Sequence, residues 1–266
     1  FLRQRFDGLP VEIAEDAAGN LWATLRGDSE KELLIGGHID SVPNGGWLDG
    51  CLNTLAGVEV LRRISAQYHG KPPVTVRVVD WADEEGARFG KSLFGSSACS
   101  GNLDLDEARG LVDQDGIKLP DALKEVGIDL QKVKDCGKER KNAAAYLELH
   151  IEQGPVLLDL DLPLGAVLGT FGVERHAITF RGQAAHSGST PMDRRKDAFF
   201  AAARMSPEIY EIAKRSGMGV CTIGSCTTKP GIVTSVVADC RITLDQRHLE
   251  ADKLATMHAE ARAASE

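Results

Sequence analysis

The sequence predicts an α/β protein with a mixed, partly parallel sheet, followed by a smaller α+β domain. Two apolar runs, at residues 33–35 and 74–81, are separated by an amphipathic stretch at 53–68. Strand, helix and strand at this spacing indicate a right-handed crossover unit, which places the two strands parallel in one sheet. Beyond the first two-thirds of the chain the pattern changes to strands and long helices, typical of an α+β domain. We therefore expect domains at residues 1–172 and 173–266.

The first domain contains further predicted elements around this unit. Residues 11–35 predict two short strands about a turn at Gly19-Asn20, and Gly36-Gly37 is expected to end the strand at 33–35. A third apolar segment at 143–149 predicts another strand of the sheet. The helix at 53–68 has an apolar face that packs on the sheet, formed by Leu55, Val58, Leu61 and Ile64.

The second domain is predicted to contain three strands and two helices. The strands lie at residues 175–180, 221–228 and 239–244, and the helices at 197–216 and 251–265. We expect the helix at 197–216 to be interrupted at Ser206-Pro207, because proline inside a helix costs about 3 kcal/mol.

Composition excludes several classes of protein. The net charge is −8, from 31 basic and 39 acidic residues without a basic block, which argues against a nucleic-acid or anionic-membrane partner. No apolar run approaches the roughly 20 residues of a membrane span. The first residues carry no signal-peptide pattern and resemble the middle of a helix, so we expect the chain to begin inside a larger protein. Six cysteines without a C-x-x-C pair indicate reduced thiols and a cytoplasmic location.

Histidine and carboxylate side chains follow each predicted strand of the first domain. His38 and Asp40 follow the first, Glu84-Glu85 the second and His150 the third, and a Pro/Asn/Gly loop returns Asp49 to the first strand end. The carboxyl ends of parallel strands meet at one edge, so a metal site is expected there. Taken singly, these residues have simpler interpretations: a turn-stabilising hydrogen bond, a solvated glutamate pair, or a buried core histidine.

The donor types predict specific roles in that site. His38, Asp49, Glu85 and His150 are the candidate ligands, and two ions about 3.5–4 Å apart need a bridging carboxylate such as Asp49. Asp40 is placed to orient His38 through its other ring nitrogen. Glu84 is the candidate general base, because neighbouring side chains diverge and a free carboxylate beside a bound water can take its proton.

Two other features of the sequence suggest different chemistry. The segment from Gly86 to Ser92 resembles a phosphate-binding P-loop, but it has three residues between its glycines where that loop needs four. A Cys99 nucleophile paired with a distant histidine is the other alternative, although nothing nearby in the sequence lowers the pKa of its thiol.

Four ordered blocks carry a family resemblance: GGHIDSVPNGGWLDG, VVDWADEEGARFGKSLFGSSA, LELHIEQGPVL and RGQAAHSGSTPMDRRKDA. Together they resemble the carbamoylase and allantoate amidohydrolase branch of the M20 metallopeptidase clan, over essentially all of the chain. The resemblance implies a two-metal catalytic domain with a smaller lid and dimerisation domain, and hence a homodimer. It implies hydrolysis of N-carbamoyl-L-amino acids or related ureido acids, with two divalent ions of zinc, manganese, cobalt or nickel as cofactors.

The same resemblance implies residue roles beyond the metal ligands. Gln153 would contact the ureido group, and His186 would stabilise the oxyanion. Arg247 would pair with the substrate carboxylate through its planar guanidinium, with Arg175 as a second cationic contact. Thr234 stands where the family has a substrate-binding asparagine, which leaves the substrate open.

Other functions stay open at this point. An allantoate or ureidoglycolate amidohydrolase, an aminoacylase and a dipeptidase share such a metal site, and an inactive relative would serve as a binding protein. The family's last metal ligand is a histidine in a later motif that this sequence lacks. We therefore expect these 266 residues alone to bind at most one ion tightly and to hydrolyse little. A substitute ligand would have to come from His69, His176, His248 or His258.

Overall fold

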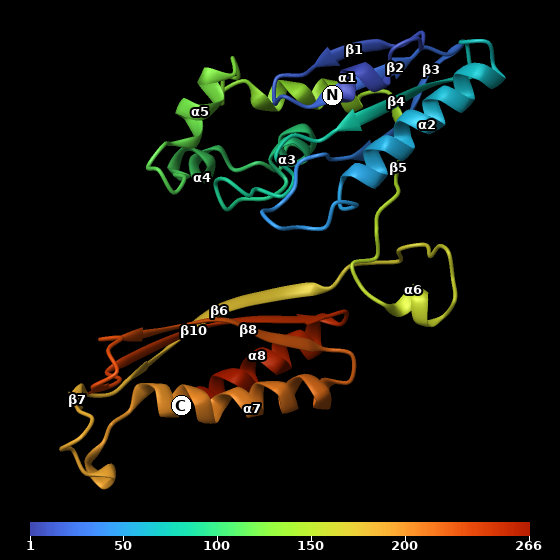
Figure 1. Ribbon diagram of the computed structural model, residues 1–266. Helices are drawn as coiled ribbons and strands as arrows, with labels where there is room; N and C mark the ends of the chain where they lie inside the picture. Colours follow the sequence, from blue (N-terminus) through green and yellow to red (C-terminus); the bar gives the residue numbers. More distant parts are fainter. The chain divides into compact units, whose positions relative to one another are not determined.

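The computed structural model describes residues 1–266. The chain forms two compact units (Figure 1). Unit 1 comprises Phe1–Asp161, and unit 2 comprises Leu162–Glu266. Each unit has its own sheet and its own apolar core.

Unit 1 is built on a five-stranded mixed sheet with the order β1-β2-β4-β3-β5. Strand β3 pairs in parallel with both β4 and β5, while the β1–β2 and β2–β4 pairs are antiparallel. The partly parallel sheet expected from the strand–helix–strand pattern is confirmed. The strands are β1 (Glu12–Glu15), β2 (Leu21–Leu25), β3 (Ser29–Gly37), β4 (Val74–Asp80) and β5 (Ala143–Glu148).

Helices cover both faces of this sheet. Side chains alternate along β4, so Val76 and Val78 pack under α2 (Cys51–Gln67) and α1 (Leu2–Arg5), while Val79 faces the other way. On that second face lie α3 (Phe94–Ser100) and the 3-10 helix η1 (Val133–Arg140). Three short helices complete the unit: α4 (Leu105–Gly110), α5 (Leu119–Glu125) and α6 (Val156–Asp159).

The strand ends at the Gly36-Gly37 pair as expected, and both glycines belong to β3 as its last two residues. Glycine is required at both positions because neighbouring side chains leave no room for a Cβ atom. A Cβ on Gly37 would lie 2.6 Å from the Asn53 side chain, and one on Gly36 would overlap the Tyr146 ring. Both neighbours border the cluster at this strand end, so the glycines bring the backbone close to it.

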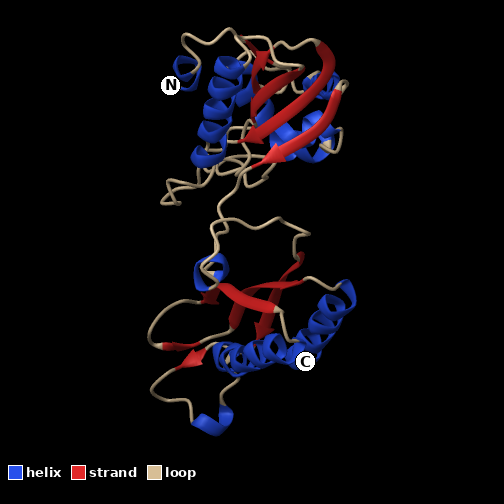
Figure 2. Ribbon diagram, turned by 90° about the vertical axis from the view of Figure 1, so that its right-hand side faces the viewer, coloured by secondary structure: helices blue, strands red, loops and turns tan.

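Unit 2 is an antiparallel sheet with two helices on one face, as Figure 2 shows. Its strands, in the order β6-β10-β8, are β6 (Gly172–Arg181), β10 (Asp239–His248) and β8 (Val220–Lys229). The helices are α7 (Ala198–Ser216) and α8 (Ala251–Ser265), which enclose an apolar core with the sheet. A small second sheet pairs β7 (Ala185–His186) with β9 (Ser235–Val236), and η2 (Met192–Arg194) is a single 3-10 turn.

The expected interruption of the helix at Ser206-Pro207 is wrong, since α7 runs unbroken from Ala198 to Ser216. Proline removes one backbone hydrogen bond, at a cost of about 3 kcal/mol. Met205, Ile209 and Ile212 are buried along the same helix face. Each such side chain contributes about 1.5–3 kcal/mol, so packing outweighs the local cost of the proline.

Candidate metal centre

The parallel strands of unit 1 bring their terminal polar residues to one edge of the sheet. His38 directly follows β3, Glu84 lies just beyond β4, and His150 just beyond β5. Because β3 is between β4 and β5, its histidine is flanked by the other two strand ends. The site therefore arises from the strand order.

Three donors lie closest together: His38, Asp49 and His150, with one ligand atom of each within 4.8 Å of the others. The Asp49 Oδ1 atom is 3.7 Å from His38 Nε2 and 3.4 Å from His150 Nε2. Two donors about 2.0–2.2 Å from a tetrahedral ion lie about 3.3–3.6 Å apart, so this set fits a divalent transition ion.

Asp49 reaches this position because Gly50 follows it. Gly50 has φ of +79° and immediately precedes α2. A Cβ there would lie 2.5 Å from the His38 carbonyl oxygen and 2.6 Å from its Nδ1 atom. Only glycine combines this backbone conformation with such a close approach to His38.

Asp40 connects His38 to the loop after β4. Its carboxylate lies 3.4 Å from His38 Nδ1, and the Asp40 carbonyl oxygen lies 3.0 Å from the same nitrogen. The two carboxylate oxygens accept hydrogen bonds from the backbone N–H groups of Glu84 and Glu85, at 3.2 and 3.0 Å. Asp40 thus orients the ring of His38 and holds the glutamate pair against the strand end.

Glu84 and Glu85 differ in their relation to the cluster. Glu84 Oε2 is 3.6 Å from His38 Nε2, the nitrogen that also faces Asp49. Glu85 is half-buried, and its carboxylate is not part of the close set of three donors. Gln153 donates a hydrogen bond to Asp49 Oδ2, which places its amide at the margin of the cluster.

The electrostatics of the cluster favour positive charge. Burial opposes protonation of His38, but Asp40 and Glu84 outweigh it and raise its pKa to about 9. Burial raises the pKa of Glu84, despite the opposing effect of His38. Burial likewise raises the pKa of Asp80 to about 6. A divalent cation would balance this excess of carboxylates around a buried imidazole.

Four neighbours of the cluster were missed by sequence reasoning. Tyr146 donates to Glu148 Oε2 at 2.5 Å and accepts from Trp81 Nε1 at 2.9 Å. Asn53 Nδ2 donates to the other Glu148 oxygen at 3.0 Å. Tyr146, Glu148 and His150 alternate along one chain segment, and this period-two pattern was a signal for Tyr146 and Glu148 but not for Trp81 and Asn53.

The predicted site residues of unit 2 form two groups. Arg175 and Arg247 both contact Asp245, with Nε–Oδ distances of 2.9 and 2.7 Å. His186 is exposed on β7, and its Nδ1 atom accepts from the N–H groups two and three residues further on, at 3.1 and 3.2 Å. Thr234 is exposed, and its carbonyl oxygen accepts from Ser187 at 3.0 Å, beside His186.

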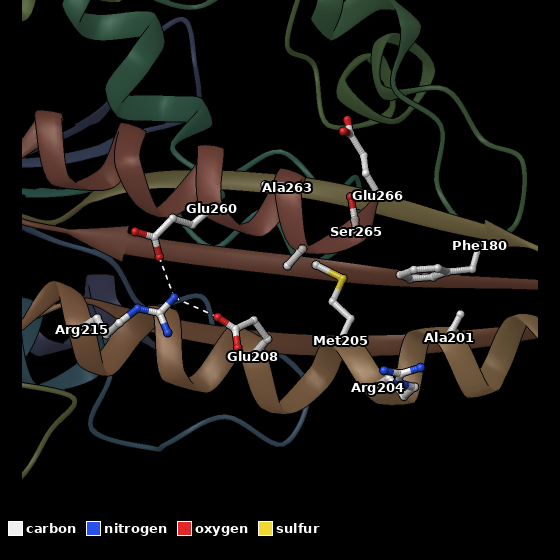
Figure 3. A pocket seen from close by; sticks show the side chains of 11 residues that line it. Phe180, Ala201, Arg204, Met205, Glu208, Arg215, Glu260, Ala263, Ser265 and Glu266 are labelled. Atoms are coloured by element: carbon white, nitrogen blue, oxygen red, sulfur yellow. Dashed lines mark hydrogen bonds and ion pairs between the residues drawn. The ribbon is translucent and has the colours of Figure 1, made fainter.

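The volume of a cavity does not identify the candidate metal centre. A cavity of about 780 Å³ lies between α7 and α8, and Arg215 at its edge forms ion pairs with Glu208 and Glu260, at 2.9 and 2.8 Å (Figure 3). It contains no group of metal-ligating side chains. A smaller cavity of about 480 Å³ in unit 1 is lined by Glu84 and Tyr146 and adjoins the cluster.

The remaining sequence-based expectations concern cysteines and membranes. All six cysteines are free. Cys99 is buried, with its thiol 3.6 Å from the Cys136 carbonyl oxygen. None of the helices has both the length and the apolar composition needed to cross a bilayer.

Unit 1 is an α/β unit in which parallel strands end in histidine and carboxylate side chains of the kind that bind metal ions. An α+β unit follows it in the chain. The model of peptidase family M20/M25/M40 matches residues 34–261. The chain belongs to this family, and the predicted family resemblance is confirmed.

Comparison with individual proteins shows which members of the family this chain resembles. The chain is 40% identical over 245 residues to an N-carbamoyl-L-amino acid amidohydrolase of Geobacillus stearothermophilus, covering 90% of this chain and 59% of that protein. It is 36% identical over 252 residues to an allantoate amidohydrolase of Escherichia coli, covering 94% and 61%. A hydantoinase/carbamoylase family amidase from Burkholderia ambifaria superposes with a TM-score of 0.81 at 33% identity, covering 99% of this chain and 64% of that one. The chain thus spans 59–64% of the length of these relatives.

Proposed function

We propose that this chain carries the metal-binding part of a metal-dependent amidohydrolase that removes the carbamoyl group from N-carbamoyl-L-amino acids. The observation that carries the proposal is the close set of His38, Asp49 and His150, with the Glu84 carboxylate beside His38. Membership of the M20 family supports the reaction class. Similarity to the Geobacillus protein supports the substrate class.

Two divalent ions, of zinc, manganese, cobalt or nickel, are the proposed cofactors. His38, Asp49 and His150 would hold one ion, and Asp49 and Glu85 would contribute to a second. Bound ions would polarise the carbamoyl carbonyl group and lower the pKa of the attacking water. The fit of the donor spacing to an ion supports the first position more directly than the second.

The protein's own groups move the proton. Glu84 takes a proton from water while the water oxygen forms a bond to the carbamoyl carbon. Glu84 then returns this proton to the amide nitrogen as the C–N bond breaks. The products are the free amino acid and carbamic acid, which decomposes to CO₂ and ammonia. Asp40 acts as a positioning residue, because it fixes both the His38 ring and the backbone of Glu84.

Unit 2 is proposed to supply contacts to the substrate as a lid. Since His186 Nδ1 accepts two backbone hydrogen bonds, its Nε2 atom carries the hydrogen and can donate to the oxyanion. Asp245 holds the guanidinium groups of Arg175 and Arg247, the proposed partners of the substrate carboxylate. Gln153 would contact the ureido group, with Thr234 bordering the substrate.

The proposal extends to assembly and location. We infer a homodimer formed through unit 2, a small ureido substrate, and no nucleic-acid or membrane partner. The cytoplasm is the inferred location. The family resemblance supports the dimer, and the net charge of −8 and six free cysteines support the other inferences.

Allantoate is the second candidate substrate, favoured by 36% identity to the Escherichia coli enzyme of that name. It is a ureido acid as well, so the same donors and the same proton path would serve. Aminoacylase or dipeptidase activity, and a binding protein without activity, are the outcomes that would contradict the proposal.

The test measures ammonia release by the protein that contains this chain, supplied with zinc, manganese, cobalt or nickel. N-carbamoyl-L-amino acids should release ammonia, while N-acetyl amino acids and dipeptides should stay intact. Glu84→Gln should lower turnover by about 10²–10⁴-fold without loss of metal, since only the proton acceptor changes. Glu125→Gln, on the exposed surface of α5, is the matched control and should be unaffected. Turnover of Glu84→Gln within a factor of about two of the unmodified protein would remove this residue from the mechanism.

A further inference from the structure

A chain of hydrogen bonds borders the candidate metal centre of unit 1. The indole N–H of Trp81 donates to the Tyr146 hydroxyl oxygen at 2.9 Å, and this hydroxyl donates to Glu148 Oε2 at 2.5 Å. The other Glu148 oxygen accepts from Asn53 Nδ2 at 3.0 Å. An indole N–H can only donate and an ionised carboxylate can only accept, so the direction of every bond is fixed. Glu148 is therefore the common acceptor of this chain.

The members of the chain belong to the segments that carry the candidate metal ligands. Glu148 is the last residue of β5 and lies two positions before His150. Asn53 is in the first turn of α2, four positions after Asp49. The Asn53–Glu148 hydrogen bond thus joins the same two segments that bring Asp49 Oδ1 to 3.4 Å from His150 Nε2.

The two glycines at the end of β3 leave room for this chain. A Cβ on Gly36 would lie 1.8 Å from the Tyr146 hydroxyl oxygen, and one on Gly37 would lie 2.6 Å from the Asn53 side chain. Consecutive residues of a strand point to opposite faces of the sheet. Tyr146 and Asn53 therefore approach from different faces, and the Glu148 carboxylate connects them at the strand end.

The Asn53 side chain makes this connection specific. Asn53 is 2% exposed, and its amide oxygen already accepts from the Thr54 N–H group at 2.9 Å. Its amide nitrogen has Glu148 as its hydrogen-bond acceptor. Loss of the carboxylate would leave a buried N–H group without a partner, which is unfavourable. The start of α2 is thereby held to the end of β5.

Two simpler explanations compete. One assigns the chain of hydrogen bonds to the stability of unit 1 alone. The other assigns Glu148 an effect through its negative charge alone, because burial raises the pKa of Glu84 and the Glu148 charge raises it further. A charge effect requires no partner for either carboxylate oxygen, yet both oxygens accept hydrogen bonds from neighbouring segments.

We propose that Glu148 is a positioning residue of the metal centre. By accepting from Asn53 and Tyr146, it holds the end of β5 against the start of α2 and so sets the spacing between Asp49 and His150. Groups that orient metal ligands without touching the ion are worth about 10–100-fold in metal affinity. This inference rests on the proposed metal centre and does not depend on the identity of the substrate.

The test is titration of the whole chain with cobalt(II), read from the visible absorption of the bound ion. Tyr146→Phe and Asn53→Leu each break the chain without changing its charge, and each should weaken cobalt binding by about 10–100-fold. Glu148→Ala should weaken it at least as much, and Glu148→Gln, which keeps one acceptor oxygen, should recover part of the loss. Adding Tyr146→Phe to Glu148→Ala should cause little further loss, because both residues act through one contact.

Two control variants separate positioning from stability. Tyr68→Phe removes an exposed hydroxyl at the end of α2 and is matched to Tyr146→Phe. Leu61→Ala opens a cavity in the core beneath α2, away from the chain of hydrogen bonds. It should unfold at lower urea concentration, yet keep the cobalt affinity and the absorption spectrum of the unmodified protein. Circular dichroism checks that each variant is folded during the titration.

The outcomes distinguish this inference from the metal centre on which it rests. Unchanged cobalt affinity in Tyr146→Phe and Asn53→Leu would overturn the positioning role and leave the metal centre intact, and a loss confined to the Glu148 variants would mean that charge alone acts. An equal loss of affinity in Leu61→Ala would assign the chain to stability. Absence of cobalt binding by the unmodified protein would overturn the metal centre itself, and the positioning role with it.

Discussion

At the scale of single residues, the cluster in unit 1 depends on how closely backbone and side chains approach one another. His38 is 1% exposed, yet Asp49 and Glu84 both reach its Nε2 atom within 4 Å. Gly50 makes this possible, because the chain turns at positive φ directly against the imidazole. Residues without catalytic chemistry thus set the donor geometry.

Gly50→Ala should destabilise unit 1 and weaken its metal binding. A non-glycine residue in such a strained conformation costs about 1–3 kcal/mol, and the new methyl group would also displace His38. Urea unfolding followed by tryptophan fluorescence measures the first effect, and zinc titration measures the second. Gly46→Ala, where a Cβ meets open space, is the matched control and should change neither. Equal stability of the two variants would contradict this account.

At the scale of elements, packing decides where helices and strands end. α7 continues through Pro207 because its apolar face is buried on the sheet of unit 2. β3 ends at its two glycines, where Gly36 still pairs with β4 and β5 and Gly37 pairs with β4. In α7, therefore, long-range contacts outweigh a local signal for termination.

Pro207→Ala should raise the free energy of unfolding of unit 2, by at most about 3 kcal/mol, because it restores a backbone N–H inside α7. Hydrogen exchange of α7 peptides in increasing urea measures the change. Pro120→Ala is the control, since Pro120 lies in the first turn of α5 where proline is tolerated. An unchanged or lower stability of Pro207→Ala would show that the helix has adapted to the proline.

At the scale of the whole molecule, the candidate metal ligands of unit 1 come from three separate segments of the chain. In unit 1, His38, Asp49 and His150 belong to the ends of β3 and β5 and to the start of α2. One ion bound there would join segments far apart in the chain. Trp22, Trp47 and Trp81 all lie in unit 1, so tryptophan fluorescence reports this unit alone.

Zinc should therefore stabilise unit 1 against urea, and a chelator should reverse the effect. At 100 times the dissociation constant the gain is about 2.7 kcal/mol, because the ion binds the folded state. His150→Ala should lose most of the gain, while His69→Ala should keep it. A zinc effect of the same size in His150→Ala would mean that His150 is not a ligand.

Apolar periodicity and the residues at strand ends were enough to predict most of the elements and the donor types near the strand ends. Period-two and helical apolar patterns predicted the strand–helix–strand unit and α8, and the ends of apolar runs identified His38, Glu84 and His150 as neighbours. These signals are local or follow from strand order, so they survive in the bare sequence.

Which side chains come into contact could not be predicted before the fold was known. The fold placed Asp49 between two histidines, kept Glu85 outside the close set, and brought His258 onto His176 from the far end of unit 2. Distances between side chains depend on packing between segments that are distant in the chain. A one-dimensional pattern records which residues are present, while burial and register decide which of them touch.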